Sequence, residues 1–158
     1  MRGWRIPVIP AARARIRLGA IKHNYALLKK RHGGGPCMAV VKANAYGHGL
    51  LPVAMALNEA DSFGVARLSE AKLLRDAGIE TDIAVLGGVA SPDDVRSAIE
   101  QRVQLCAHTL EHVAWLEQAD GESIDVWLKV NTGMNRLGIE PADASRAIER
   151  LSNAAMST

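Results

Sequence analysis

The sequence predicts an α/β fold built on a parallel β-sheet. Five short apolar runs recur along the 158 residues, and helical stretches lie between them. Most of the runs are rich in Val, Leu or Ile, as in strands that are buried on both faces. The later runs begin about 21 residues apart, which is the length of a strand plus one crossover helix. Repeated βα units of this kind produce a parallel sheet.

The strand predictions rest on these apolar runs. The expected strands are residues 37–42, 62–67, 82–87, 103–108 and 125–130. A further stretch, ARARIRL at 12–18, is a candidate strand that pairs elsewhere.

The helix predictions rest on start and stop signals between the strands. The expected helices are residues 19–32, 49–60, 69–77, 91–101, 110–119 and 141–152. Gly33-Gly34-Gly35 is a clear stop for the first helix. Ser91 and Thr109 suit the N-cap positions of two later helices, and Pro141 suits the first turn of the last helix.

The number of βα units leaves two architectures open. Five units can form a small open, doubly wound sheet. They can also be the first part of a (β/α) barrel, which needs eight strands and typically about 250 residues.

Composition and charge exclude several classes of protein. The hydrophobic fraction of 48% is ordinary for a soluble globular protein, and there is no run of about 18 apolar residues that could span a membrane. Residues 1–58 carry ten Lys/Arg and no acid, but without the interleaved aromatic residues of single-strand nucleic-acid binders. Cys37 and Cys106 lie in apolar runs and are predicted to be buried thiols. We therefore expect a cytoplasmic protein that binds neither nucleic acid nor membrane.

A single lysine stands at the end of the first strand, in AVVKANAYGHG (39–49). Chemistry in parallel α/β folds gathers where strands end and loops begin. An amine at such a position can form a Schiff base with an aldehyde if it loses its proton. Periodicity alone, however, favours a lysine that merely extends from a strand end to solvent. From spacing, Lys42 is thus a candidate reagent only.

A second basic loop follows the fifth strand, in LKVNTGMNRLG (128–138). Lys129 lies near the strand end, and Arg136 offers a planar donor fork that suits a carboxylate or a phenolate. Two basic groups that face one crevice would suit an anionic ligand with a carbonyl group.

Three stretches of the chain resemble the alanine racemase family in that family's order and spacing. AVVKANAYGHG is very similar to the pyridoxal-phosphate lysine signature of bacterial alanine racemases. LKVNTGMNRLG resembles the family's second conserved stretch, and RIRLGAIKHNYALLK looks like its opening. The resemblance runs from about residue 12 to residue 150.

The resemblance implies a role for five residues. Lys42 would be the Schiff-base lysine for pyridoxal 5'-phosphate and one of two catalytic bases. Tyr46 would line the cofactor near its phosphate, and Leu86 would pack beside the ring. Arg136 would contact the phenolic oxygen of the cofactor and the carboxylate of the substrate. Lys129 matches a lysine that is carbamylated in several members.

The resemblance also implies a fold and a division into domains. The expected fold is a parallel, TIM-barrel-type (β/α) domain that is incomplete, with about five βα units. Residues 1–11 would be an N-terminal extension and residues 12–158 a partial barrel domain. The C-terminal β domain of the family, whose tyrosine is the second base across a homodimer interface, is absent from this sequence. Arg17 and Asn131 stand where the family commonly has Asp.

The resulting hypothesis is an isomerase that interconverts L-alanine and D-alanine for peptidoglycan synthesis. The isolated chain is expected to be inactive because it is truncated. The alternative is a non-catalytic remnant or a partial pyridoxal-phosphate-binding domain. A shorter barrel of the cofactor-carrier type ranks last, because that group lacks AYGHG and GMNRLG.

One metal-like pattern is set aside. HTLEH (108–112) fits the H-x-x-E-H zinc pattern, which needs both histidines on one helix. Because Thr109 is the expected N-cap, we expect His108 to end the preceding strand and His112 to be an ordinary helix residue. No metal site is predicted.

Overall fold

The computed structural model describes residues 13–119 and 124–156, and these form one parallel sheet with helices between the strands. The proposed extension at 1–11 lies outside the described residues. The strands are β1 (Met38–Val40), β2 (Ser62–Val65), β3 (Asp82–Val85), β4 (Gln104–Ala107) and β5 (Val126–Leu128). The helices are α1 (Leu18–Arg31), α2 (Lys42–Tyr46), α3 (Leu50–Ala56), α4 (Leu68–Asp76), α5 (Pro92–Glu100), α6 (Leu110–Glu117) and α7 (Pro141–Met156).

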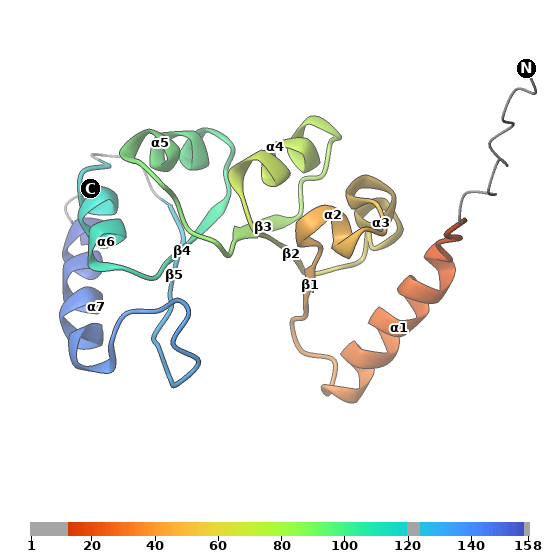
Figure 1. The fold of residues 1–158 in the computed structure, drawn as a ribbon, viewed down its shortest axis with the longest axis horizontal. Coiled ribbons are helices and arrows are strands. Elements are labelled where there is room, and N and C mark those ends of the chain that lie inside the picture. The colour runs from red at the N-terminus through yellow and green to blue at the C-terminus, as the bar shows by residue number, and fades with distance from the viewer. Residues whose placement is uncertain (1–12, 120–123, 157–158) are drawn as a thin grey trace, which may run out of the picture.

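The strand order decides between the two architectures. The strands lie in the order β1-β2-β3-β4-β5, and each pairs in parallel with the next one in the chain. A doubly wound sheet would contain a point where the order reverses, and the described sheet has none. The helices follow one another in an arc around the outside of the sheet (Figure 1). The described fold is therefore of the barrel type, with five of its strands.

The two faces of the sheet differ in what they contact. Outward-facing strand residues such as Phe63, Ile83, Val85 and Leu105 are fully or almost fully buried against the helices. Side chains alternate between the faces of a strand, so the other set points to the concave inner face. That set includes Val40 and Trp127, which are 40% and 53% exposed. The main core of the described chain thus lies outside the sheet, between the strands and the helices.

The predicted helix ends are confirmed where caps were expected. The Ser91 hydroxyl accepts from the N–H of Asp94 at 3.2 Å, and the Thr109 hydroxyl accepts from the N–H of His112 at 3.1 Å. After α1, Gly33 and Gly34 adopt φ values of +82° and +78°, which glycine adopts most easily.

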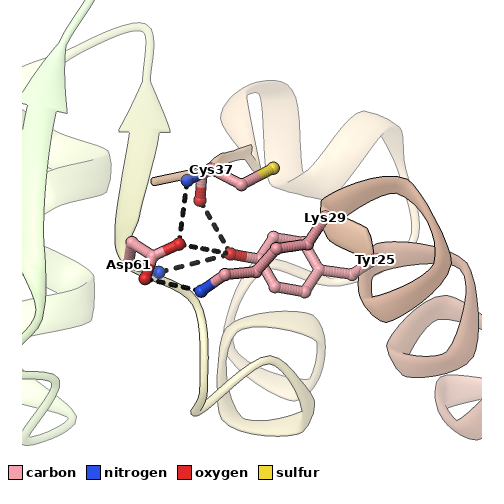
Figure 2. Close-up of polar contacts among 4 residues, drawn as sticks. All are labelled: Tyr25, Lys29, Cys37 and Asp61. Carbon is pink, nitrogen blue, oxygen red and sulfur yellow. Dashed lines mark hydrogen bonds and ion pairs between the residues drawn. The ribbon is translucent and has the colours of Figure 1, made fainter. Parts of the chain in front are cut away.

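One carboxylate ties α1 to the amino-terminal end of the sheet (Figure 2). Asp61 accepts from the Lys29 ammonium at 2.6 Å and from the N–H of Cys37 at 2.8 Å. The Tyr25 hydroxyl lies 3.3 Å from the same carboxylate and donates to the Cys37 carbonyl at 2.7 Å. The Lys29 ammonium and the Cys37 N–H hold the pKa of Asp61 below its usual range.

The last helix, α7, packs against α6, and the two helices enclose a second, smaller core. Val113, Ile139 and Ala147 are buried together there. Arg150 also donates to both carboxylate oxygens of Glu117, at 2.7 and 2.6 Å.

The structure also bears on the candidate strand at 12–18 and on the expectation that no segment spans a membrane. The candidate strand at 12–18 is wrong for the residues that are described, because residues 13–17 pair with no strand and α1 begins at Leu18. No helix in the described ranges is both long enough and apolar enough to cross a membrane.

Candidate functional site

Three of the predicted residues lie just beyond the carboxyl ends of their strands, at the same end of the sheet. Val40 pairs with Gly64, and Gly64 with Ala84. Leu86 lies two residues beyond Ala84, and its side chain approaches Gly64 on the concave face, while Lys42 lies two residues beyond Val40 at the carboxyl end of β1. Cys106 pairs with Trp127, and Lys129 follows Trp127 by two residues on that face. Leu86 and Lys129 therefore share the concave face, and Lys42 stands at the same carboxyl end of the sheet.

Lys42 directly follows Val41, a buried residue just after β1. Val41 is 2% exposed and its N–H donates to the Gly64 carbonyl at 2.8 Å, which continues the ladder between β1 and β2. Lys42 itself is half-buried. The amine therefore extends from a backbone that is fixed on its amino-terminal side.

The segment labelled α2, which leads the chain away from Lys42, is a left-handed helical turn, and the sequence did not predict it. Ala43, Asn44, Ala45 and Tyr46 all have φ between +52° and +57°. The left-handed conformation costs L-residues roughly 1–2 kcal/mol each, with Asn the most tolerant of them. Four consecutive residues of this kind, none of them glycine, store strain beside Lys42, as is frequent at functional sites.

Side chains within the motif stabilise this turn. The Asn44 side-chain oxygen accepts from the N–H of Leu50 at 2.8 Å, at the start of α3. The His48 Nδ1 atom lies 2.9 Å from the Ala45 carbonyl and 3.1 Å from that of Tyr46. Since both partners are acceptors, Nδ1 carries the hydrogen. His48 is thus a turn residue as expected, while the Tyr46 side chain is 61% exposed.

A carboxylate from the next βα unit also holds the turn. Oε1 of Glu70 accepts from the N–H of Ala43 at 2.6 Å, and its Oε2 accepts from the N–H of Ala66 at 2.8 Å. Sequence reasoning missed Glu70, because an acid in the first turn of a helix is ordinary. Its position beside the Lys42 turn depends on the pairing of β1 with β2.

Two glycines near Leu86 are closely surrounded by other atoms. A Cβ atom at Gly64 would lie 2.9 Å from Met38 Sδ and 3.0 Å from Leu86 Cδ1. A Cβ atom at Gly87 would lie 2.2 Å from the Ala66 carbonyl oxygen. The Met38 and Leu86 side chains cover Gly64 and the Ala66 carbonyl abuts Gly87, so neither position has room for a side chain.

The loop after β5 carries Arg136 and is organised by Asn131. The side-chain oxygen of Asn131 accepts from the N–H groups of Gly133 and Asn135, both at 3.1 Å. Its amide nitrogen donates to Asn135 at 2.8 Å and to Glu140 at 2.9 Å. Asn131 therefore fixes the loop although the family commonly has Asp there. The Arg136 side chain at the tip is exposed.

Lys129 lies near a buried thiol on the concave face. Burial raises the pKa of Cys106, and the positive charge of Lys129 opposes that rise. Across residues 13–119 and 124–156, no hydrogen bond or ion pair joins any two of Lys42, Tyr46, Leu86, Lys129 and Arg136. Lys42, Leu86 and Lys129 follow the carboxyl ends of β1, β3 and β5, and the roles of all five residues stay predictions.

The two histidines of HTLEH contact each other beside the loop after β3. His108 directly follows β4, outside α6, whereas His112 lies in α6 as predicted, and their ring centroids are 4.3 Å apart. The His108 N–H points to Nδ1 of His112 at 3.4 Å. Burial and the neighbouring His108 lower the pKa of His112. Within the described ranges, no three His, Cys, Asp or Glu side chains are grouped so that they could hold a metal ion.

Comparison with known proteins identifies the family. The family described as "Alanine racemase, N-terminal domain" matches residues 16–157. An alanine racemase from Vibrio parahaemolyticus is 45% identical over 142 residues, which are 89% of this chain and 40% of that protein. The structure of alanine racemase from Acinetobacter baumannii superposes with a TM-score of 0.82 at 34% identity, over 87% of this chain and 40% of that one.

A structural neighbour with another substrate in its name is also similar. Histidine racemase from Leuconostoc mesenteroides has a TM-score of 0.77 at 33% identity, over 87% of this chain and 38% of that one. The chain spans about 40% of the length of the curated relatives that it matches. The family match, the curated relatives and the barrel-type sheet agree, and the chain belongs to the alanine racemase N-terminal domain family.

Proposed function

We propose that this chain provides the pyridoxal-phosphate-binding part of an alanine racemase. The observation that carries the proposal is the placement of Lys42. The half-buried Lys42 stands at the carboxyl end of β1, the same end of the sheet where Leu86 follows β3 and Lys129 follows β5. Family membership supports the reaction class, because the matched relatives are named alanine racemases.

The residues present fit the cofactor. The residues that match the family's cofactor contacts, Lys42, Tyr46, Leu86 and Arg136, are all present, and Lys42 and Leu86 follow the carboxyl ends of β1 and β3. Lys42 would hold the aldehyde carbon covalently, and Tyr46 and Arg136 would contact the phosphate side and the phenolic oxygen. When bound, pyridoxal phosphate supplies a pyridine ring that delocalises the electron pair left when an amino acid loses its α-proton.

The chain's own contribution to proton transfer is one base. The Lys42 amine would take or return the α-proton on one face of the substrate. Arg136 would hold the substrate carboxylate, since its fork can donate two parallel hydrogen bonds. The family's second base is a tyrosine of the β domain, so a homodimer of the longer protein would complete the site. We place the reaction in the cytoplasm, in the supply of D-alanine for peptidoglycan.

The amino-acid substrate is proposed to be alanine because the curated relatives at up to 45% identity carry that name. The similar histidine racemase shows that this type of barrel also occurs in a racemase named for another side chain. The described residues are compatible with the part of the site that any amino acid shares, namely the cofactor amine and the carboxylate contact.

An absorbance titration tests the proposal. Pyridoxal phosphate is added to the purified chain, excess is removed by gel filtration, and the spectrum between 300 and 500 nm is recorded. We expect retained absorbance near the violet edge that is lost in Lys42→Ala and kept in Lys72→Ala, whose lysine lies on α4 and is 63% exposed. If the cofactor washes away equally from all three proteins, the chain is a non-binding remnant and the proposal fails.

A further inference from the structure

We propose that Glu70 is a positioning residue for Lys42, because its carboxylate fixes the left-handed turn through which the chain leaves that lysine. This inference rests on the proposed function of Lys42 and deepens it. The backbone of Lys42 is held before it by the β1–β2 ladder and after it by this carboxylate.

The first argument is that the first N–H groups of the turn have no carbonyl partner within it. The first N–H groups of any helical turn have no carbonyl partner within the turn. In the turn at 43–46, the first two such groups belong to Ala43 and Asn44. They point to Oε1 of Glu70 at 2.6 and 3.4 Å. Glu70 therefore acts as the cap of a left-handed turn, although it belongs to a different helix.

The second argument is that both carboxylate oxygens are used, and on different segments. While Oε1 accepts from the turn after β1, Oε2 accepts from Ala66 N–H at 2.8 Å, just after β2. Glu70 itself sits in the first turn of α4, where the helix dipole favours a negative charge. One side chain thus joins the carboxyl ends of two neighbouring strands and the start of a helix.

The third argument is that the backbone of the turn is strained and needs stabilising contacts from outside the turn. Ala43 and Ala45 are alanines in a conformation that L-residues avoid, and Ala43 is exposed to solvent. Contacts inside the motif, such as Gly47 N–H to the Ala43 carbonyl at 3.1 Å, can form only once the turn is made. The bonds to Glu70 link the turn to the sheet and so define its direction.

The test uses Glu70→Gln, which keeps the size of the side chain but leaves one oxygen acceptor. Its NH₂ group would face an N–H donor, so one of the two links must break. The matched control is Glu111→Gln, because Glu111 is also an acid in the first turn of a strand-following helix, α6. Both variants are compared at a temperature where far-UV circular dichroism shows them folded.

The first readout is amide hydrogen exchange in the cofactor-free chain. The amides of the broken link, either those of Ala43 and Asn44 or that of Ala66, should exchange about 10- to 100-fold faster in Glu70→Gln, as expected when a hydrogen bond to a charged acceptor is lost. Amides of β3 should not change, and Glu111→Gln should match the wild type. Unchanged exchange at all three amides overturns the inference. If Glu70→Gln does not fold, the wild type still decides: an unprotected Ala43 amide, despite its 2.6 Å bond, overturns the inference as well.

The second readout separates positioning from a purely structural role. Pyridoxal phosphate is added, reduced with borohydride, and the share of label at Lys42 is measured by peptide mapping. We expect that share to fall several-fold in Glu70→Gln, together with the circular dichroism band of the bound cofactor. A normal share with faster exchange refutes the positioning role. Unselective labelling of the wild type refutes the proposed function instead, while the exchange result still decides whether Glu70 holds the turn.

Discussion

Replacing Gly87 by alanine should destabilise the protein through a backbone collision at the site. Gly87 follows β3 and is not among the glycines with positive φ, so its conformation suits any residue. Its constraint is space, because a Cβ atom would lie 2.2 Å from the Ala66 carbonyl oxygen, and real Cβ atoms essentially never come closer than 3.0 Å. The ends of β2 and β3 would have to separate by most of an ångström.

The size of the effect follows from the type of neighbour. Overpacking typically costs about 1–3 kcal/mol of unfolding free energy. We expect the upper part of that range, because a carbonyl in a strand end moves less easily than a side chain. For a chain of this size the melting temperature should fall by roughly 2–4 °C for each kcal/mol.

The assay is urea unfolding at pH 7, followed by far-UV circular dichroism and tryptophan fluorescence. Gly19→Ala in α1 is the matched control, since no atom lies within 4 Å of its new Cβ. Glycine within a helix is less stable than alanine by about 0.5–1 kcal/mol, so the same substitution should stabilise there. A lower free energy of unfolding for Gly87→Ala and a higher one for Gly19→Ala support the account. A Gly87→Ala protein as stable as the wild type refutes it.

Three further outcomes are expected. Because Lys29 and Cys37 lower the pKa of Asp61, the stability that its charge provides is present above the unfolded-state pKa and is lost as the pH falls through the folded-state pKa. The stability gap between wild type and Asp61→Asn in urea unfolding should therefore narrow on acidification, and a gap that widens contradicts this. Since β1 and β5 are the edges of the described sheet and unpaired edges invite association, light scattering should show mass that rises with concentration, whereas a compact monomer throughout argues against it. A purified chain of these 158 residues should not racemise alanine above the free-cofactor rate, because the proposal gives it only one of the two bases and each such group typically contributes about 10²–10⁴-fold. A robust turnover in a coupled D-alanine assay would show that another group of this chain acts as the second base.

Local signals predicted most of the fold. All five strands lie within the predicted ranges, and the caps at Ser91 and Thr109 form the predicted hydrogen bonds. These features depend on apolar runs and on single side chains near their own backbone. The choice between a barrel and an open sheet could not be made from periodicity, because both use the same βα unit. The strand order and the resemblance to a family decide it.

The features of the site that were missed depend on contacts between distant segments. No local propensity favours four left-handed residues in ANAY, so the sequence does not predict this turn. It forms because Glu70, 27 positions after Ala43, reaches the turn across the β1–β2 pair. Likewise, ARARIRL has strand-like residues, but residues 13–17 find no partner strand in the described chain.

Peptide mapping after borohydride reduction tests the central claim most directly. The chain is saturated with pyridoxal phosphate, reduced, digested and analysed by mass spectrometry, with Lys42→Ala and Lys72→Ala in parallel. If Lys42 is the cofactor lysine, one pyridoxyl group should be found on the peptide that contains AVVKANAYGHG, and only Lys42→Ala should lose it. Label spread over the exposed lysines, with no preference for Lys42, would contradict the account.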